Sequence, residues 1–402
     1  MRRIFVLSCG FYLLIGITSV VLGSLLPVLL SYYDRAYSDG GTLLFLQFLG
    51  FLVGVLASPM MSAGMGRKWM LAFALLSIIV AYTVIGFLPP WIWVVVMTLG
   101  VGFGSGIIES SIGAFTIEFA EEQKAVAMTK LDVYFGLGAL LIPAIVSLYI
   151  TLGIWQVTFF TISAITFILM LMWITMPAAS SSKLRDPGSE GSGDSPKKIR
   201  YTGRHIPLLT LFVAFFFVYM GLELGLMNFL PSILIETIQV KESVAALSVT
   251  ILWVAMVIGR LFVGKIAESV RYTPFLFWST VGTLLFIVAM AAVSSEWVTY
   301  LLIFGIGLFM SGLFSIALVY ANSLIPGMTE KTTSILIASG GIGGAVLQFF
   351  IGWSMSEWSA IHSVWILAGF SGVLLLSIGL THQWKVRNQP MGNHLIHQGN
   401  DI

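Results

Sequence analysis

Long apolar runs separated by short polar breaks dominate the chain. Residues 4–33 contain no Asp, Glu, Lys or Arg, and neither do residues 40–66. A helix that crosses the hydrocarbon core of a bilayer needs about 20 apolar residues, so each of these runs is long enough for one span. Continued along the chain, the pattern predicts twelve transmembrane helices, at 5–30, 42–63, 69–88, 92–118, 128–150, 155–176, 207–235, 244–266, 274–293, 297–321, 332–355 and 360–381.

One segment interrupts the apolar pattern. Residues 177–206 are rich in Ser, Gly, Pro and charged residues, which is typical of a flexible linker. This linker, predicted to be cytoplasmic, separates an N-terminal six-helix bundle (1–176) from a C-terminal six-helix bundle (207–381). Residues 382–402 are polar and are predicted to form a cytoplasmic tail.

The two halves contain matching short segments. Pro27 in GSLLPVLL aligns with Pro231 in NFLPSILI at an offset of 204, and Gly138 in GLGALL aligns with Gly344 in GIGGAV at an offset of 206. A near-constant offset predicts two pseudo-symmetric halves. Parallel six-helix halves are typical of major facilitator transporters, which bind substrate between the halves near the middle of the bilayer.

Composition excludes the soluble classes of protein. The chain is 58% hydrophobic and 9% charged, whereas an ordinary soluble domain is about 25% charged. Such a chain cannot build the water-facing surface of a soluble enzyme, a nucleic-acid binder or a disordered scaffold. Its single cysteine, Cys9, excludes a disulfide framework and a cysteine-based metal site.

The basic residues predict the orientation. With the N-terminus in the cytoplasm, 18 of the 20 Lys and Arg residues fall on the cytoplasmic side, and only Arg35 and Lys241 fall outside. Cytoplasmic loops are enriched in Lys and Arg, so both termini are predicted to be cytoplasmic. In this interpretation Arg260 is one of the cytoplasmic residues: either part of a degenerate loop motif after the eighth span, or a simple anchor.

Besides Glu118 at the end of its span, three carboxylates fall inside predicted spans. An ionised side chain at the bilayer centre costs about 2.5–3.5 kcal/mol, so such a residue is expected to line a cavity, to have a partner or to titrate. Glu109 lies well inside its span, Asp132 lies about two turns into the next span if that helix starts near Ala125, and Glu223 lies past the middle of the seventh span. The alternatives are a hydrogen bond between helices for Glu109 and Glu223, and exposure to cytoplasmic water for Asp132.

Neutral polar and aromatic residues in the spans suit a sugar. Amide side chains such as those of Gln47, Asn228 and Gln348 can bind hydroxyl groups, and Trp253 offers a flat apolar face for stacking. Each of them could equally serve helix packing. Pro231 is expected to make the backbone near Asn228 irregular, which is tolerated at membrane depth where it lines a cavity.

Six segments, in chain order, resemble the fucose–galactose–hexose:proton symporter branch of the major facilitator superfamily: LQFLGFLVGVL, ESSIGAF, KLDVYFGLGALLIP, YMGLELGLMNFLPSI, WVAMVIGRLFVGK and IASGGIGGAVLQFFIGW. The resemblance implies that Glu109 handles both proton and substrate. It places Asp132 where the branch has an amide or an acid in the fifth span, and Glu223 and Asn228 in a seventh-span motif of bacillary sugar carriers. The fucose carriers also have an Asp in the first span, where this chain has Gly23, so a two-acid proton relay would need Glu109 and Asp132.

We therefore expect an all-α membrane protein with the twelve-helix major facilitator fold. It would not be an enzyme but a secondary transporter that carries a monosaccharide, a hexose of the glucose/mannose type, together with a proton by alternating access. A proton-coupled exporter of drugs or antibiotics is the alternative. The predicted proton-coupling residues are Glu109 and Asp132, and the predicted substrate-binding residues are Glu109, Asp132, Gln47, Glu223, Asn228, Trp253 and Gln348.

No cofactor, metal ion or nucleic acid is expected to take part. The proton motive force is the expected energy source, with sodium as an open alternative. The expected partners are a sugar, a proton and the lipid bilayer, and the protein is expected to act as a monomer in a bacterial cell membrane.

Overall fold

The computed structural model describes residues 2–119, 124–176, 206–325 and 329–388, and every regular element within them is an α-helix. Helices suit an apolar surrounding because they satisfy their own backbone hydrogen bonds. The elements are α1 (Arg2–Tyr33), α2 (Tyr37–Gly86), α3 (Trp91–Phe119), α4 (Lys124–Thr151), α5 (Val157–Ile174), α7 (Ile206–Ile238), α8 (Glu242–Val270), α9 (Tyr272–Ala292), α10 (Glu296–Met310), α11 (Leu313–Leu324), α12 (Thr329–Glu357) and α13 (Ala360–Asn388).

The described residues include twelve helical segments that are long and apolar enough to cross a membrane, as predicted. Two details differ from the prediction. The second and third spans are the two parts of α2, which meet at Gly66 with a φ of 79° instead of being joined by a loop. A positive φ is accessible to glycine without steric cost. The tenth span is divided between α10 and α11 at Ser311 and Gly312.

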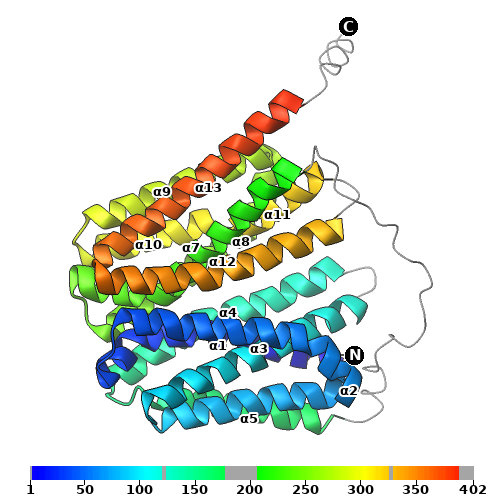
Figure 1. Ribbon diagram of the computed structural model, residues 1–402, viewed down its shortest axis with the longest axis vertical. Helices are drawn as coiled ribbons and strands as arrows, with labels where there is room; N and C mark the ends of the chain where they lie inside the picture. Colours follow the sequence, from blue (N-terminus) through cyan, green and yellow to red (C-terminus); the bar gives the residue numbers. More distant parts are fainter. Residues whose placement is uncertain (1, 120–123, 177–205, 326–328, 389–402) are drawn as a thin grey trace.

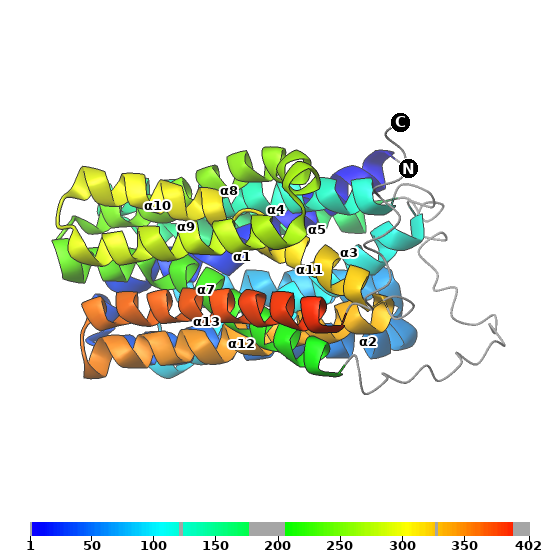
Figure 2. The same cartoon turned by 90° about the horizontal axis from the view of Figure 1, so that it is seen from above.

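The helices form two groups that lie side by side (Figure 1), with α1–α5 in one half and α7–α13 in the other. The first helix begins and the last helix ends at the same end of the molecule (Figures 1 and 2). We call this end the N/C end and the opposite end the far end. The predicted linker lies outside the described residues apart from Ile206, so the exact domain division stays a prediction, and α13 extends to Asn388, into the predicted tail.

Most contacts between the two halves are made by three helix pairs, α1 with α7, α2 with α12, and α4 with α8, and α1 also contacts α8. At the far end α2 and α12 approach until their backbones touch, since a Cβ atom on Gly352 would lie 2.7 Å from Cα of Gly41. The backbone N–H of Ser38 donates a hydrogen bond to the Ser356 hydroxyl over 2.7 Å. The interface between the halves is therefore closed at the far end.

Polar contacts accompany this closure. The Tyr37 hydroxyl at the start of α2 donates a hydrogen bond of 2.8 Å to the Glu236 carboxylate near the end of α7. Arg35 and Lys241, the two basic residues predicted to lie outside the cell, immediately precede far-end helix starts, those of α2 and α8. Their shared position agrees with the predicted topology, in which the far end faces outward.

A labelling experiment tests this orientation. Ser295 at the far end and Ser269 at the N/C end are both exposed and can be replaced by cysteine in a Cys9→Ser background. A membrane-impermeant thiol reagent should label the Ser295→Cys variant in intact cells and the Ser269→Cys variant only after permeabilisation. The reverse pattern would mean that the chain is inserted the other way round.

Candidate functional site

Two carboxylates of the N-terminal half lie together. Glu109 projects from α3, and Asp132 lies about two turns after the start of α4, as predicted. The two carboxyl groups are close enough to interact electrostatically. Tyr12 of α1 is buried and lies near both carboxyl groups. The structure therefore brings the two predicted proton-coupling residues into one cluster, next to a tyrosine that the sequence did not indicate.

A second charged pair lies in the C-terminal half. Nη2 of Arg260 in α8 is 4.0 Å from Oε1 of Glu223 in α7, and the Glu223 side chain is only 11% exposed. Arg260 was predicted only as a residue of the cytoplasmic side, and its partners inside the bundle were not foreseen. The membrane-spanning part of α8 extends from Glu242 to Val263 and includes Arg260, whose guanidinium Cζ lies 5.5 Å from the ring centroid of Trp253, two turns back along the helix. Arginine in a span needs such partners because its charge is costly in hydrocarbon.

The four charged residues lie at a similar depth. Counted at 1.5 Å per residue from the far-end residue of each helix, Glu109, Asp132, Glu223 and Arg260 are about 22–29 Å along their helices. Arg260 interacts electrostatically with Asp132 as well as with Glu223. The guanidinium group of Arg260 thus interacts with one acid from each half, Asp132 and Glu223.

Tyr219 lies one turn before Glu223 on α7 and is buried. Its hydroxyl group is 3.4 Å from the backbone oxygen of Met310 and also interacts with the Glu223 carboxyl group. One hydroxyl proton serves one acceptor at a time, so Tyr219 can change its partner when the charge of Glu223 changes.

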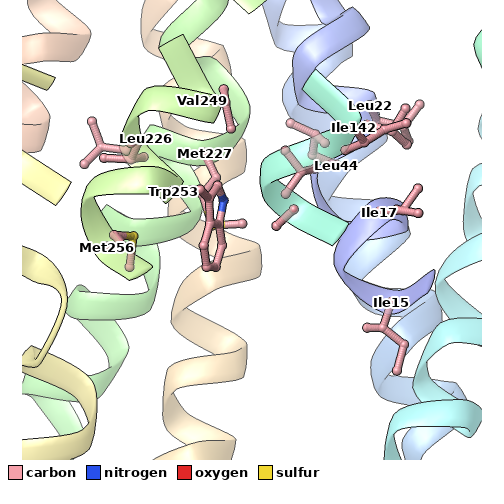
Figure 3. Close-up of a cluster of buried hydrophobic side chains, with 14 of the residues drawn as sticks. Ile15, Ile17, Leu22, Leu44, Ile142, Leu226, Met227, Val249, Trp253 and Met256 are labelled. Atoms are coloured by element: carbon pink, nitrogen blue, oxygen red, sulfur yellow. The ribbon is translucent and has the colours of Figure 1, made fainter. Parts of the chain in front are cut away.

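Trp253 lies where the halves meet. Its ring projects from α8 toward α1 in Figure 3, and its centroid is 5.8 Å from that of Phe135 on α4. The ring is buried, yet within the described part of the chain its Nε1 atom has no hydrogen-bond partner. Buried donors are nearly always satisfied, so a free one beside a polar cluster is a candidate ligand contact. This placement fits the predicted substrate role.

The two amides of the C-terminal half form a pair. Nδ2 of Asn228 donates to Oε1 of Gln348 over 2.7 Å, and Nε2 of Gln348 donates to the Gly344 carbonyl over 3.0 Å. Oδ1 of Asn228 is buried and lacks a hydrogen-bond partner among the described residues. The expected irregularity at Pro231 is not found: α7 continues through this residue as a helix, because one missing N–H group is tolerated inside a packed bundle.

Gln47 is placed differently from the other predicted ligands. Its Nε2 atom donates a hydrogen bond of 2.8 Å to the backbone oxygen of Thr18 on α1, and the side chain is half-buried. This bond fastens α2 to α1 within the N-terminal half. The geometry favours the packing interpretation of Gln47, and its role in binding stays a prediction.

The sequence profile of the Major Facilitator Superfamily matches residues 8–269 and 211–393. The chain belongs to the Major Facilitator Superfamily.

Relatives of this major facilitator support the resemblance seen in the sequence. The chain is 30% identical over 378 residues to the glucose/mannose transporter GlcP of Bacillus subtilis, covering 93% of this chain and 94% of that protein. Among solved structures, the D-xylose-proton symporter superposes with a TM-score of 0.73 at 14% identity, covering 95% of this chain and 97% of the other. The nucleoside transporter NupG gives a TM-score of 0.73 at 14% identity, covering 95% and 98%. At these identities the two structures support the fold alone.

The missing first-span acid of this major facilitator has a steric reason. A Cβ atom on Gly23 would overlap Cα and Oδ1 of Asn228, because α1 and α7 pack backbone to backbone at this point. An aspartate at position 23 is incompatible with this approach. The first helix contributes Tyr12 to the acid cluster instead.

The contact between Gly23 and Asn228 can be tested by stability. Gly23→Ala should destabilise the protein by about 1–3 kcal/mol, since overpacking forces the α1–α7 contact apart. Gly369→Ala is the matched control, because no atom lies within 4 Å of a Cβ at that helical position. Thermal unfolding in detergent would measure both, and equal melting temperatures for the two variants would rule out the tight contact.

Proposed function

We propose that this protein is a secondary transporter that carries a hexose together with a proton by alternating access. The proposal is supported by the similarity to a relative described as a glucose/mannose transporter, which extends over almost the whole of both chains. As in other members of its superfamily, the two halves would rock about a central site. Because a single chain supplies both halves, we expect a monomer to be sufficient for transport.

The observation that best supports the proposal is the convergence of charged and polar groups from both halves. Glu109 and Asp132 come from the N-terminal half, and Glu223 and Arg260 come from the C-terminal half. Ionisable side chains inside a span mark ion and proton pathways by default. Glu109 and Asp132 are the proposed proton acceptors, because they are the two carboxylates that the N-terminal half contributes to this cluster.

A sugar would bind next to these acids. The apolar face of Trp253 can stack on a sugar ring, while its free Nε1 atom and the free Oδ1 atom of Asn228 supply a donor and an acceptor for hydroxyl groups. Gln348 orients Asn228 through their hydrogen bond. We assign Glu223 to the same site, where it can accept from a sugar hydroxyl.

We interpret the conformation as open toward the N/C end. Glycine backbones close the far end of the interface at Gly41 and Gly352. By contrast, the side chains of Asp132 and Arg260, which lie toward the N/C end, are accessible. In the predicted orientation this is the inward-facing state, in which sugar and proton leave for the cytoplasm.

Neutralising Glu109 should abolish the coupling of sugar transport to protons while leaving the conformational change that carries the sugar. In proteoliposomes, Glu109→Gln should lose uphill accumulation of glucose driven by a proton gradient, while glucose exchange without a gradient is partly retained. Glu357→Gln, at an exposed far-end position, is the control and should transport normally. Replacing sodium with potassium should leave wild-type accumulation unchanged. Full accumulation by Glu109→Gln would contradict the proton-coupling role, and dependence on sodium would assign the coupling to that ion.

The substrate class can be tested on purified protein. A hexose at 100 times its Kd should stabilise the fold by about 2.7 kcal/mol, which raises the melting temperature. Trp253→Ala should lose this response, whereas Trp297→Ala should keep it, since Trp297 is 84% exposed. Stabilisation by cationic drugs but by no sugar would favour the exporter alternative.

A further inference from the structure

Arg260 occupies a position at which its charge can act on both halves. Val257 and Trp253 of α8 face α4 at Gly136, where an added Cβ would lie 3.5 Å from Val257 and 3.8 Å from Trp253. The two helices run in opposite directions, and Thr250 of α8 also donates a hydrogen bond of 3.1 Å to the Leu140 carbonyl of α4. These contacts determine which face of α8 packs against which face of α4.

The same register sets Arg260 opposite Asp132. Arg260 follows Val257 by three residues, and Asp132 precedes Gly136 by four, so each lies one helical turn from the contact on the face that meets the other helix. Side chains on a helix point back toward its N-terminus, and the guanidinium group of Arg260 does so, lying over Trp253. Arg260 thus faces α4 on the side that carries Asp132, with which it interacts electrostatically, and it lies 4.0 Å from Glu223 of its own half.

The two partners of Arg260 differ in one respect. Glu223 belongs to the same rigid half, so its distance of 4.0 Å from Arg260 need not change when the halves rock. Asp132 belongs to the other half, so its distance to Arg260 changes with every cycle. The Arg260 side chain is 39% exposed, so it is not enclosed on all sides by the bundle.

We propose that Arg260 is a positioning residue whose attraction to ionised Asp132 draws the two halves together on the N/C side, and that a proton on Asp132 releases them. This inference rests on the proposed proton coupling. It identifies Arg260 as the charged group through which protonation of Asp132 in the N-terminal half affects the position of the C-terminal half. The other titratable groups that face this cluster are Tyr12 on α1, Glu109 on α3, and Tyr219 and Glu223 on α7.

A distance measurement tests the proposal without a substrate. Spin labels at Met65→Cys and Ser269→Cys, both exposed and toward the N/C end, would report the separation of the halves in the Cys9→Ser protein. We expect a shorter distance at high pH than at low pH. Arg260→Gln and Asp132→Asn should each remove most of this response and leave the longer distance, and the double variant should show no further change.

Two further variants test whether the positive charge at position 260 is what produces the pH response. Arg260→Lys keeps the charge and should restore a pH response, whereas Arg271→Gln, beyond the membrane-spanning part of α8, should leave it unchanged. A normal pH response in Arg260→Gln, or additive losses in the double variant, would overturn the proposal. A labelled protein that shows the predicted response but accumulates no glucose would refute the proposed function and leave the role of Arg260 standing.

Discussion

The high free energy of an isolated charge in hydrocarbon determines much of this architecture. Charged side chains within the spans must find partners or water, and Glu109, Asp132, Glu223 and Arg260 do so at the junction of the two halves. The outward surface of the bundle shows the opposite pattern, with large exposed apolar residues such as Leu56 and Trp278. Polarity is thus concentrated where the two halves meet.

Since lipid is as apolar as the helices, close packing replaces the hydrophobic effect in holding each half together. Gly102 and Gly106 of α3 let α2 approach until a Cβ on either would overlap a backbone oxygen, that of Gln47 or Phe51. This helix pair has the same close contact from Gly50, whose Cβ would overlap the backbone of Leu99. Such interlocking within a half makes it a rigid body, which a rocking mechanism requires.

The number and approximate positions of the spans were predictable because each depends only on a local run of apolar residues. The family resemblance implied only that a two-acid relay would need Glu109 and Asp132, and in the structure these two groups interact electrostatically. The partners of Arg260 were not predictable, because a basic residue near the end of a span has the same local sequence whether it faces cytoplasmic loops or points back into the bundle. Only its tertiary neighbours, Glu223 and Trp253, decide between the two. Tyr12 was missed for a similar reason, since a tyrosine in a span is most often a packing residue.

The closure at the far end has a thermodynamic consequence. Besides glycine contacts, it includes two interhelical hydrogen bonds, Tyr37 to Glu236 and Ser38 to Ser356. Together these contribute about 2–4.5 kcal/mol, at about 0.5–1.5 kcal/mol for the neutral bond and about 1.5–3 kcal/mol for the bond to a carboxylate. A ligand with a millimolar dissociation constant binds with about 4 kcal/mol, and only the part that differs between the two states shifts their populations. The two hydrogen bonds of this closure are therefore comparable in free energy with the binding of a weakly bound solute.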